Sequence, residues 1–230
     1  MLGGRYQRDL MAKPSDFSRQ RARMVERQLR KRGIHDERAL EAMKAVPREL
    51  FVPDQVRTGS YNDSALPIGH GQTISQPWVV AAICQALALD GDEKVLEIGT
   101  GSGYSTAILA RLAERVISLE RITELAEDAR GRLEELGIEN AEVIVADGSQ
   151  GHPGKAPYGA IAVHAASPEA PHSLLAQLAP GGRLVVPIAT GSADLLTVFW
   201  RDEEGLHQET IGPCRFVPLI GAEGFHTEAD

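Results

Sequence analysis

The chain has 230 residues, a formal net charge of −8, 43% hydrophobic and 24% charged residues, and two cysteines. This composition is that of a globular chain that can bury a core without disulfides. Cys84 and Cys214 have no Cys or His at zinc-ligand spacing, which excludes a structural zinc site and predicts reduced thiols. No apolar run reaches the roughly 18 residues of a membrane helix, and the first 14 residues lack the apolar core of a signal peptide. We therefore expect a cytoplasmic protein without a membrane partner.

The charge is distributed unevenly along the chain. Residues 1–50 carry 13 basic and 7 acidic side chains, and residues 51–230 carry 11 and 25. A basic N-terminal part can bind nucleic acid. However, Met24, Val25 and Leu29 interrupt the basic run at near-helical spacing, and no aromatic residue is interleaved for base stacking. The pattern favours a solvated amphipathic helix, and no nucleic-acid partner is expected.

The N-terminal part predicts a short lead-in followed by two helices. Residues 1–17 are expected to be a mobile lead-in. A first helix is predicted from Phe17 to about residue 32, where Gly33 ends it. A second helix is predicted to start after Asp36, a plausible N-cap, and to end at Val46 before Pro47.

A long loop and a buried helix are predicted next. Residues 47–76 contain many turn formers and few periodic runs, and loops of that length are commonly functional. A helix is predicted to start with Pro77 at its first position. Its run from Trp78 to Leu89 is apolar nearly all round, which indicates burial on most sides.

The pattern changes after Gly91 to strands alternating with amphipathic helices, which predicts right-handed crossovers and a parallel sheet. The fold class is thus α/β, with a helical N-terminal cap and C-terminal edge strands. One domain is expected over residues 18–230, with the cap and the loop in 18–90 and the α/β core in 91–230. Strands are predicted at about 94–98, 115–119, 142–146, 159–164 and 183–188, helices at about 104–113, 122–136 and 168–179, and antiparallel edge strands at 195–200 and 214–219.

The strongest functional signal is a glycine-rich turn between a strand and a helix. Gly99, Gly101 and Gly103 stand at alternate positions after the apolar strand, with Ser102 between the last two. Such glycines let a ligand approach the backbone beside a helix N-terminus. The spacing is not the G-x-G-x-x-G of dinucleotide-binding proteins. Glu97, two places before the first glycine, would suit the cationic end of a ligand.

Acidic residues also follow the next two predicted strands. Glu120 lies about twenty residues beyond the glycines, where a carboxylate can accept both hydroxyls of a ribose. Asp147, followed by Gly148, can accept a hydrogen bond from an exocyclic amine. Taken singly, each acid is more often a helix cap or a solvated loop end. Together they predict a site for a nucleoside with a cationic tail.

This constellation resembles the class I methyltransferases that use S-adenosyl-L-methionine, and the chain as a whole resembles the protein-L-isoaspartate O-methyltransferases. The resemblance runs from about Met24 to Leu219, with its segments in the order of that family. His70, His164 and His172 depart from the pattern of the family. The matching segments are Met24–Leu29, Arg32–Ile34, Val46–Pro53, Tyr61 with Asp63, Leu66–Gly69, Gly71–Pro77, the glycine turn, Gln177–Leu178 with Gly181–Gly182, and Phe216–Leu219.

The resemblance implies a Rossmann-like sheet, S-adenosyl-L-methionine as cofactor, and isoaspartyl-containing proteins and peptides as substrates. It implies that Ser75 is the catalytic residue. Phe216–Leu219 would help to form the peptide groove, and a monomer is expected. The cofactor-binding residues implied by the resemblance and by the acid and glycine pattern are Thr73, Ile74, Ser75, Glu97, Gly99, Gly101, Ser102, Gly103, Glu120, Asp147 and Gly148, and no metal site is expected.

The chemistry of the implied reaction agrees with the residues. An isoaspartyl linkage leaves a free α-carboxylate with a reference pKa of about 3.5, which is ionised at neutral pH. No general base is required, and no His–Asp or Cys–His arrangement stands out among the seven histidines. Ser75 would orient the acceptor and would not deprotonate it. Its alternative role is that of a helix cap close to Pro77.

Three other functions remain open from the sequence. A relative in the same family can methylate a true aspartate in a ribosomal peptide. A nicotinamide-dependent oxidoreductase is disfavoured by the glycine spacing. A nucleic-acid-binding module depends only on the basic N-terminal part.

Overall fold

The computed structural model describes residues 14–226. Most of the lead-in expected at 1–17 lies outside the described residues. Helix α1 spans Pro14–Met24 and begins three residues before Phe17, with proline at its first position. It continues through a π-helical turn, Val25–Leu29, and a 3-10 turn, Arg30–Arg32. Gly33, with φ of 90°, ends it as predicted.

The second helix, α2, spans Glu37–Ala45. The carboxylate of Asp36 accepts hydrogen bonds from the backbone N–H of Arg38 and Ala39, which confirms the predicted N-cap. In the helix before it, Met24, Val25 and Leu29 are buried, while Arg30 pairs with Glu37 at the surface. The amphipathic interpretation of the basic segment is therefore confirmed.

The segment 47–76 is more ordered than a loop. It contains two 3-10 turns, Arg48–Phe51 and Asp54–Gly59, followed by the antiparallel strands β1 (Leu66–Gly69) and β2 (Gln72–Ile74). Strands of four and three residues are too short to show an alternation of apolar and polar residues in the sequence. The turn between them has three consecutive residues with positive φ, which are Gly69, His70 and Gly71. Glycine adopts this geometry without strain at the first and third of these positions.

The core of the molecule is a seven-stranded sheet with the order β5-β4-β3-β6-β7-β8-β9. The five predicted strands are confirmed, and the pairs among them are parallel. The order reverses between β3 and β6, which creates a crevice at the carboxyl ends of the strands. The strands are β3 (Lys94–Ile98), β4 (Arg115–Glu120), β5 (Ala141–Val145), β6 (Tyr158–Val163), β7 (Leu178–Ala189), β8 (Asp194–Asp202) and β9 (Gly205–Cys214).

The second edge strand is displaced from its predicted position. β8 covers the predicted run 195–200, but its antiparallel partner β9 ends at Cys214, where the other predicted strand would begin. Asp202 closes the hairpin by accepting from the backbone N–H of Glu204 and Gly205. β9 is largely exposed and polar, so its sequence lacks an apolar face. The run 214–219 instead leads across the sheet edge, with Pro218 bridging to Ala166.

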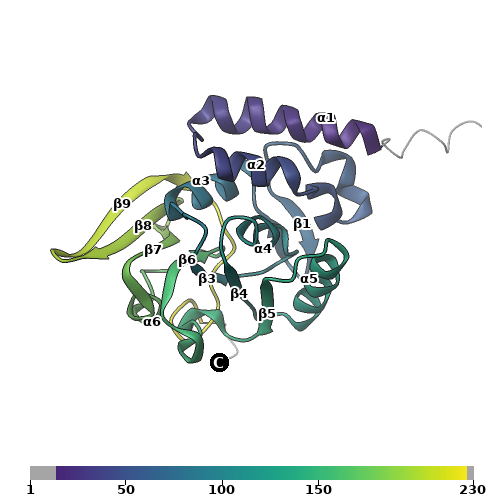
Figure 1. The fold of residues 1–230 in the computed structure, drawn as a ribbon. Coiled ribbons are helices and arrows are strands. Elements are labelled where there is room, and N and C mark those ends of the chain that lie inside the picture. The colour runs from purple at the N-terminus through teal and green to yellow at the C-terminus, as the bar shows by residue number, and fades with distance from the viewer. Residues whose placement is uncertain (1–13, 227–230) are drawn as a thin grey trace, which may run out of the picture.

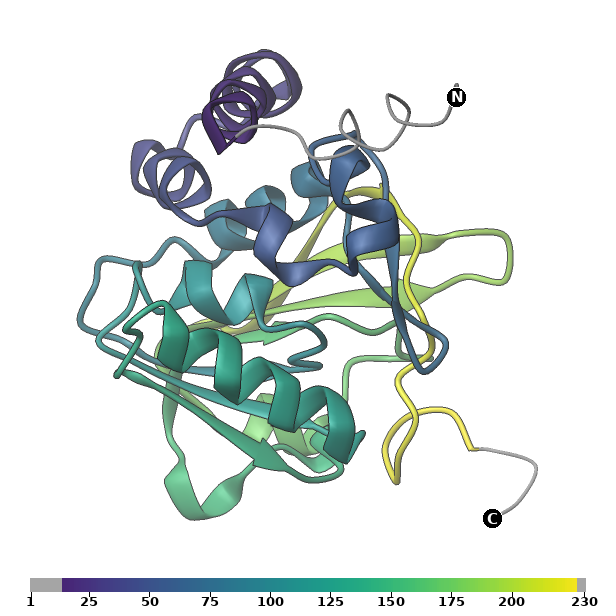
Figure 2. The ribbon, with the colours of Figure 1, turned by 90° about the vertical axis from the view of Figure 1, so that its right-hand side faces the viewer.

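Helices cover both faces of the sheet (Figure 2). Val95 and Leu96 point to opposite faces and belong to separate apolar clusters, so the strands are buried on both sides. The predicted helices at 104–113 and 168–179 are shorter in the structure. One face packs against α3 (Pro77–Leu87), α4 (Tyr104–Leu109) and α5 (Thr123–Glu135), and the other against α6 (His172–Ala176) and the segment that contains Leu219.

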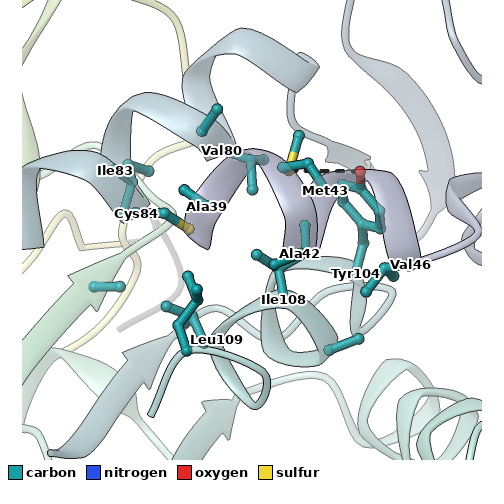
Figure 3. Close-up of a cluster of buried hydrophobic side chains, with 14 of the residues drawn as sticks. Ala39, Ala42, Met43, Val46, Val80, Ile83, Cys84, Tyr104, Ile108 and Leu109 are labelled. Atoms are coloured by element: carbon teal, nitrogen blue, oxygen red, sulfur yellow. Dashed lines mark hydrogen bonds between the residues drawn. The ribbon is translucent and has the colours of Figure 1, made fainter. Parts of the chain in front are cut away.

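The N-terminal helices α1 and α2 form a further layer over α3 and α4 (Figure 1). Side chains of α2, α3 and α4 interdigitate between these layers (Figure 3), including Met43, Val80, Cys84 and Tyr104. The same apolar cluster extends from Met24 to the sheet residues. Within residues 14–226, no helix combines the length and apolar character needed to cross a membrane.

Candidate active site

A cavity of about 320 Å³ opens at the carboxyl ends of the central strands. This volume lies within the range of small-molecule sites. The order of the strands reverses at this point, where open α/β sheets bind their ligands. Its walls come from the glycine turn after β3, the end of β4, Gly148 after β5, the end of β6, the β2 arm from Gly71 to Ser75, and the segment Val217–Ile220.

The glycine turn forms the floor of the cavity, as the spacing predicts. Gly99, Gly101 and Ser102 line it. Gly99 and Gly101 have φ of 90° and 54°, which glycine adopts without strain. Gly103 does not line the cavity. A Cβ at Gly103 would lie 3.2 Å from the Cβ of Ala129, so this glycine lets α4 pack closely against α5.

Glu120 joins the glycine turn to the end of β4. Its Oε2 accepts from the backbone N–H of Gly101 at 2.9 Å, and its Oε1 accepts from the N–H of Ile122 at 3.0 Å. Only 6% of the residue is exposed, and it lines the cavity. A carboxylate oxygen has two lone pairs, so each oxygen can accept a further hydrogen bond from a ligand hydroxyl.

Glu97, which is predicted to contact the cofactor, is not among the residues that line the cavity. The residue is fully buried on the α4 face of β3. Its carboxylate accepts from the hydroxyls of Ser105, Thr106 at 2.5 Å and Ser118 at 2.6 Å, and His164 Nε2 lies 3.3 Å from its Oε1.

These contacts fix the ionised form of Glu97. Burial raises the pKa of Glu97, but His164 and the hydroxyls of Ser105 and Ser118 together lower it below its ordinary value. Glu97 therefore carries a negative charge beneath the glycine turn, although its side chain does not line the cavity.

Asp147 also lies outside the cavity wall. Its carboxylate accepts from the backbone N–H of Ser149 at 2.8 Å and of Ala222 at 2.9 Å. Burial raises the pKa of Asp147, but these two bonds, the Ser149 side chain and the charge of Arg121 together lower it below its ordinary value. Asp147 thus caps the 3-10 turn Gly148–Gln150 and anchors the C-terminal segment. Its neighbour Gly148 does line the cavity, where a Cβ would collide with Ile98 Cγ2 at 2.5 Å.

The β2 arm brings Thr73, Ile74 and Ser75 to the wall of the same cavity. The helix-cap alternative for Ser75 is not found, because Gln76 occupies the N-cap position of α3 and makes no side-chain cap bond. Within residues 14–226, no side chain forms a hydrogen bond with the Ser75 hydroxyl. None of the described histidines bonds to this hydroxyl, and an acceptor that is already ionised needs no such activation.

The sequence does not predict several of the residues that line the cavity, because packing alone brings them there. Tyr104 and Ser105 begin α4, and Arg121 follows β4. His164 follows β6, and its backbone N–H donates to the Ile98 carbonyl at 2.8 Å. Its departure from the family pattern was the only signal of it in the sequence. His70, the other departure near the site, lies at the exposed turn of the β1–β2 hairpin and does not line the cavity.

Comparisons with known proteins place the chain in a family. Residues 19–224 match the protein-L-isoaspartate(D-aspartate) O-methyltransferase (PCMT) family. Protein-L-isoaspartate O-methyltransferase 1 of Syntrophobacter fumaroxidans is 51% identical over 210 residues, which are 91% of this chain and 98% of that protein. The protein of the same name from Rhodopseudomonas palustris is 51% identical over 217 residues, covering 94% and 89%.

Solved structures give the same result. A protein-L-isoaspartate O-methyltransferase is similar with a TM-score of 0.77 and 30% identity, over 88% of this chain and 66% of that one. A putative protein-L-isoaspartate O-methyltransferase from Plasmodium falciparum, in complex with S-adenosyl-L-homocysteine, is similar with a TM-score of 0.75 and 25% identity, covering 87% and 98%. This chain belongs to the protein-L-isoaspartate(D-aspartate) O-methyltransferase family.

Proposed function

We propose that the chain transfers the methyl group of S-adenosyl-L-methionine to the free α-carboxylate of L-isoaspartyl residues in damaged proteins and peptides. The observation that carries this proposal is one cavity with two different walls. One wall has the glycine turn and the Glu120 carboxylate, and the other has the Ser75 hydroxyl without a base. A nucleoside cofactor fits the first wall, and an anionic acceptor fits the second.

The cofactor wall has the donors and acceptors that a nucleoside needs. When bound, S-adenosyl-L-methionine supplies an electrophilic methyl group on a sulfonium centre. Glu120 would hold the ribose hydroxyls, and the backbone of Gly99, Gly101 and Ser102 would line the cofactor. Gly148 would leave room at the adenine side. Thr73 and Ile74 would lie along the methionine end, and the buried charge of Glu97 favours a cation above the turn.

The acceptor wall positions a carboxylate and need not deprotonate it. The isoaspartyl α-carboxylate is ionised at neutral pH, since its reference pKa is about 3.5. Ser75 donates a hydrogen bond to one carboxylate oxygen and leaves the other to accept the methyl group. Orientation of this kind can supply about 7–11 kcal/mol. The segment Phe216–Leu219, part of which lines the cavity, would hold the peptide.

The product completes the repair by its own chemistry after release. The neighbouring backbone nitrogen attacks the methyl ester carbonyl, its proton leaves with methanol, and a succinimide ring closes. Water opens the ring partly to normal aspartate.

We also propose that the chain works as a monomer in the cytoplasm and that residues 18–230 act as one domain. Cys84 and Cys214 are both free thiols, as in a reducing compartment. One apolar cluster includes residues of α1, α2 and the sheet, which favours a single cooperative unit. Light scattering after size exclusion should give a mass near 24.8 kDa, and twice that value would contradict the monomer.

The direct test uses two synthetic peptides that differ only in an isoaspartyl or a normal aspartyl linkage. The purified chain and methyl-labelled S-adenosyl-L-methionine are incubated with each peptide. Label is expected in the isoaspartyl peptide alone. Equal labelling, or labelling of the aspartyl peptide alone, would refute the proposal and favour modification of normal aspartate.

A further inference from the structure

Arg48 is a fully buried cation behind the acceptor wall. It has 0% exposure and is the largest of the fully buried side chains among the described residues. Its Nη2 donates to the Ser75 carbonyl at 2.8 Å, and its Nε donates to the Ser60 carbonyl at 2.7 Å. Its guanidinium carbon lies 4.9 Å from the ring centre of Tyr104. One side chain thus links the two ends of the segment 60–75 to the start of α4.

The charge of Arg48 has no carboxylate partner among the described residues. The adjacent Glu49 instead accepts a hydrogen bond from Tyr61 and lies 3.8 Å from Arg21. Arg48 Nη1 is buried and has no hydrogen-bond partner within residues 14–226. An arginine stays protonated in proteins, and an isolated buried charge is unfavourable unless something compensates it. The two carbonyl bonds and the Tyr104 ring compensate part of this cost, but no carboxylate among the described residues neutralises the charge.

The contacts of Arg48 lead directly to the site. Ser75 and Tyr104 both line the cavity. The Tyr104 hydroxyl donates a hydrogen bond to Met43 Sδ at 3.7 Å (Figure 3). The acids near the cavity are Glu120 in its wall and Glu97 beneath its floor, and both repel an anionic acceptor. Arg121, a cation in the lining of the cavity, is exposed, and its charge helps to lower the pKa of Asp147.

We propose that Arg48 is a positioning residue for the acceptor: it fixes Ser75 through the Ser75 carbonyl, and its buried positive charge favours a carboxylate at the Ser75 hydroxyl. The inference rests on the proposed function. In a low-dielectric environment, a fixed charge acts strongly over short distances, and it needs no contact with the acceptor to do so.

The test compares Arg48→Met, which removes the charge and both carbonyl bonds, with Arg48→Lys, which keeps the charge but has no planar fork for two carbonyls. We expect Arg48→Met to raise the KM of an isoaspartyl peptide at least tenfold and to lower kcat. Arg48→Lys should return KM to within threefold of the wild type while kcat stays low. The Kd of S-adenosyl-L-homocysteine should change less than twofold in both variants.

Arg21→Met is the matched control. Like Arg48, Arg21 donates to a main-chain carbonyl, that of Ala45 at 3.0 Å. Arg21 is partly buried and does not line the cavity. This variant should lower the Tm and leave KM unchanged. If Arg48 were only structural, both Arg48 variants would lose cofactor affinity in parallel with Tm, and their KM values would not separate.

A second measurement addresses the charge directly. A peptide with an α-carboxamide in place of the isoaspartyl α-carboxylate is an uncharged analogue of the acceptor. With S-adenosyl-L-homocysteine present, the wild type and Arg48→Lys should bind the carboxylate at least tenfold more tightly than the carboxamide, and Arg48→Met should lose this preference. A preference retained in Arg48→Met would overturn the proposal.

If Arg48→Met does not fold, Arg48→Lys decides: a kcat equal to that of the wild type, or a lost carboxylate preference, overturns the proposal. Failure of the wild type to methylate isoaspartyl peptide would instead refute the proposed function. The two failures are therefore distinguishable.

Discussion

Ser75 is the residue whose substitution best separates chemistry from stability. Its hydroxyl lines the cavity and forms no cap bond to α3. Removing a bond that positions the reacting group typically costs a factor of about 100–1,000 in rate. We expect Ser75→Ala to lower turnover of an isoaspartyl peptide at least tenfold, with Tm and S-adenosyl-L-homocysteine affinity little changed. Ser64→Ala, an exposed serine outside the cavity, is the control. Unchanged turnover would show that the backbone alone positions the acceptor.

Glu97 makes stability depend on pH. Its pKa lies below the ordinary 4.5, so its contribution to folding is present above that value and is lost as pH falls through the lowered pKa. Glu97→Gln should therefore be strongly destabilised at pH 7, and the difference from the wild type should shrink as pH falls below the ordinary value of 4.5. Urea unfolding of both proteins at pH 7 and at a pH below 4.5 measures this difference in stability. Glu127→Gln, at an exposed position, is the control. A difference that grows on acidification would contradict the ionised assignment.

The sequence located the acids of the site better than it assigned their roles. Strand position placed Glu97, Glu120 and Asp147 at the correct edge of the sheet. Their contacts depend on tertiary packing, because hydroxyls of α4 and β4 surround Glu97 and the backbone of Ala222 reaches Asp147. Arg48 gave no signal of burial, since a charged residue in a turn-rich segment is ordinarily exposed.

At the scale of elements, the glycine turn is tested by Gly101→Val. Gly101 has φ of 54°, and an added Cβ would lie 3.4 Å from Ile68 Cδ1. A β-branched residue is strained in this conformation and would narrow the cavity. A hundredfold excess of S-adenosyl-L-homocysteine over its Kd should stabilise the wild type by about 2.7 kcal/mol. Gly101→Val should lose most of this stabilisation, measured as a Tm shift.

Gly131→Ala is the matched control for the turn. Gly131 lies in α5 with nothing within 4 Å of an added Cβ, so alanine should raise stability by about 0.5–1 kcal/mol and leave binding intact. If Gly101→Val binds like the wild type, the assignment of the turn to the cofactor is wrong.

The C-terminal segment is the second element with a testable anchor. Asp147→Ala removes the bonds to Ser149 and Ala222, which should cost about 1 kcal/mol, as a lost cap does. We expect faster chymotrypsin cleavage after Phe225, because local opening becomes easier. Asp202→Ala, which loses a comparable turn at the distant β8–β9 hairpin, should leave that cleavage rate unchanged. An unchanged rate in Asp147→Ala would show that Glu223 and Ser173 hold the segment without Asp147.

Elements with a strong apolar period were predictable, and elements held by packing were not. β3 was predicted at its observed bounds, because strands covered on both faces are continuous apolar runs. β9 and the β1–β2 hairpin escaped prediction, since one is polar and exposed and the other has strands of four and three residues. The order of the strands and the shape of the cavity depend on contacts between distant segments.

At the scale of the whole molecule, the two walls of the cavity come from separate parts of the chain. Ser75 belongs to the segment that follows the N-terminal helices, and the glycine turn and Glu120 belong to the sheet. The helical layer packs on α3 and α4, so the cap and the sheet share one core (Figure 1). Correct placement of Ser75 opposite Glu120 therefore requires the whole fold.

An acceptor carboxylate that is already ionised needs no general base, which predicts a flat pH–rate profile. The acceptor is ionised throughout, so the rate at saturating substrates should vary less than threefold between about pH 6 and 8. His164→Gln should leave the shape of the profile unchanged, and His70→Gln, at the exposed hairpin turn, serves as its control. An inflection that disappears only in His164→Gln would show that this histidine takes part in the reaction.

The most direct measurement of the central claim locates the transferred methyl group. A peptide with one isoaspartyl and one normal aspartyl residue is incubated with the chain and S-adenosyl-L-methionine at mildly acidic pH, where methyl esters persist, and is analysed by tandem mass spectrometry. We predict a methyl ester at the isoaspartyl α-carboxylate alone, formed by the wild type and strongly reduced in Ser75→Ala. A methyl group on the normal aspartyl side chain, or on any nitrogen, would contradict the account.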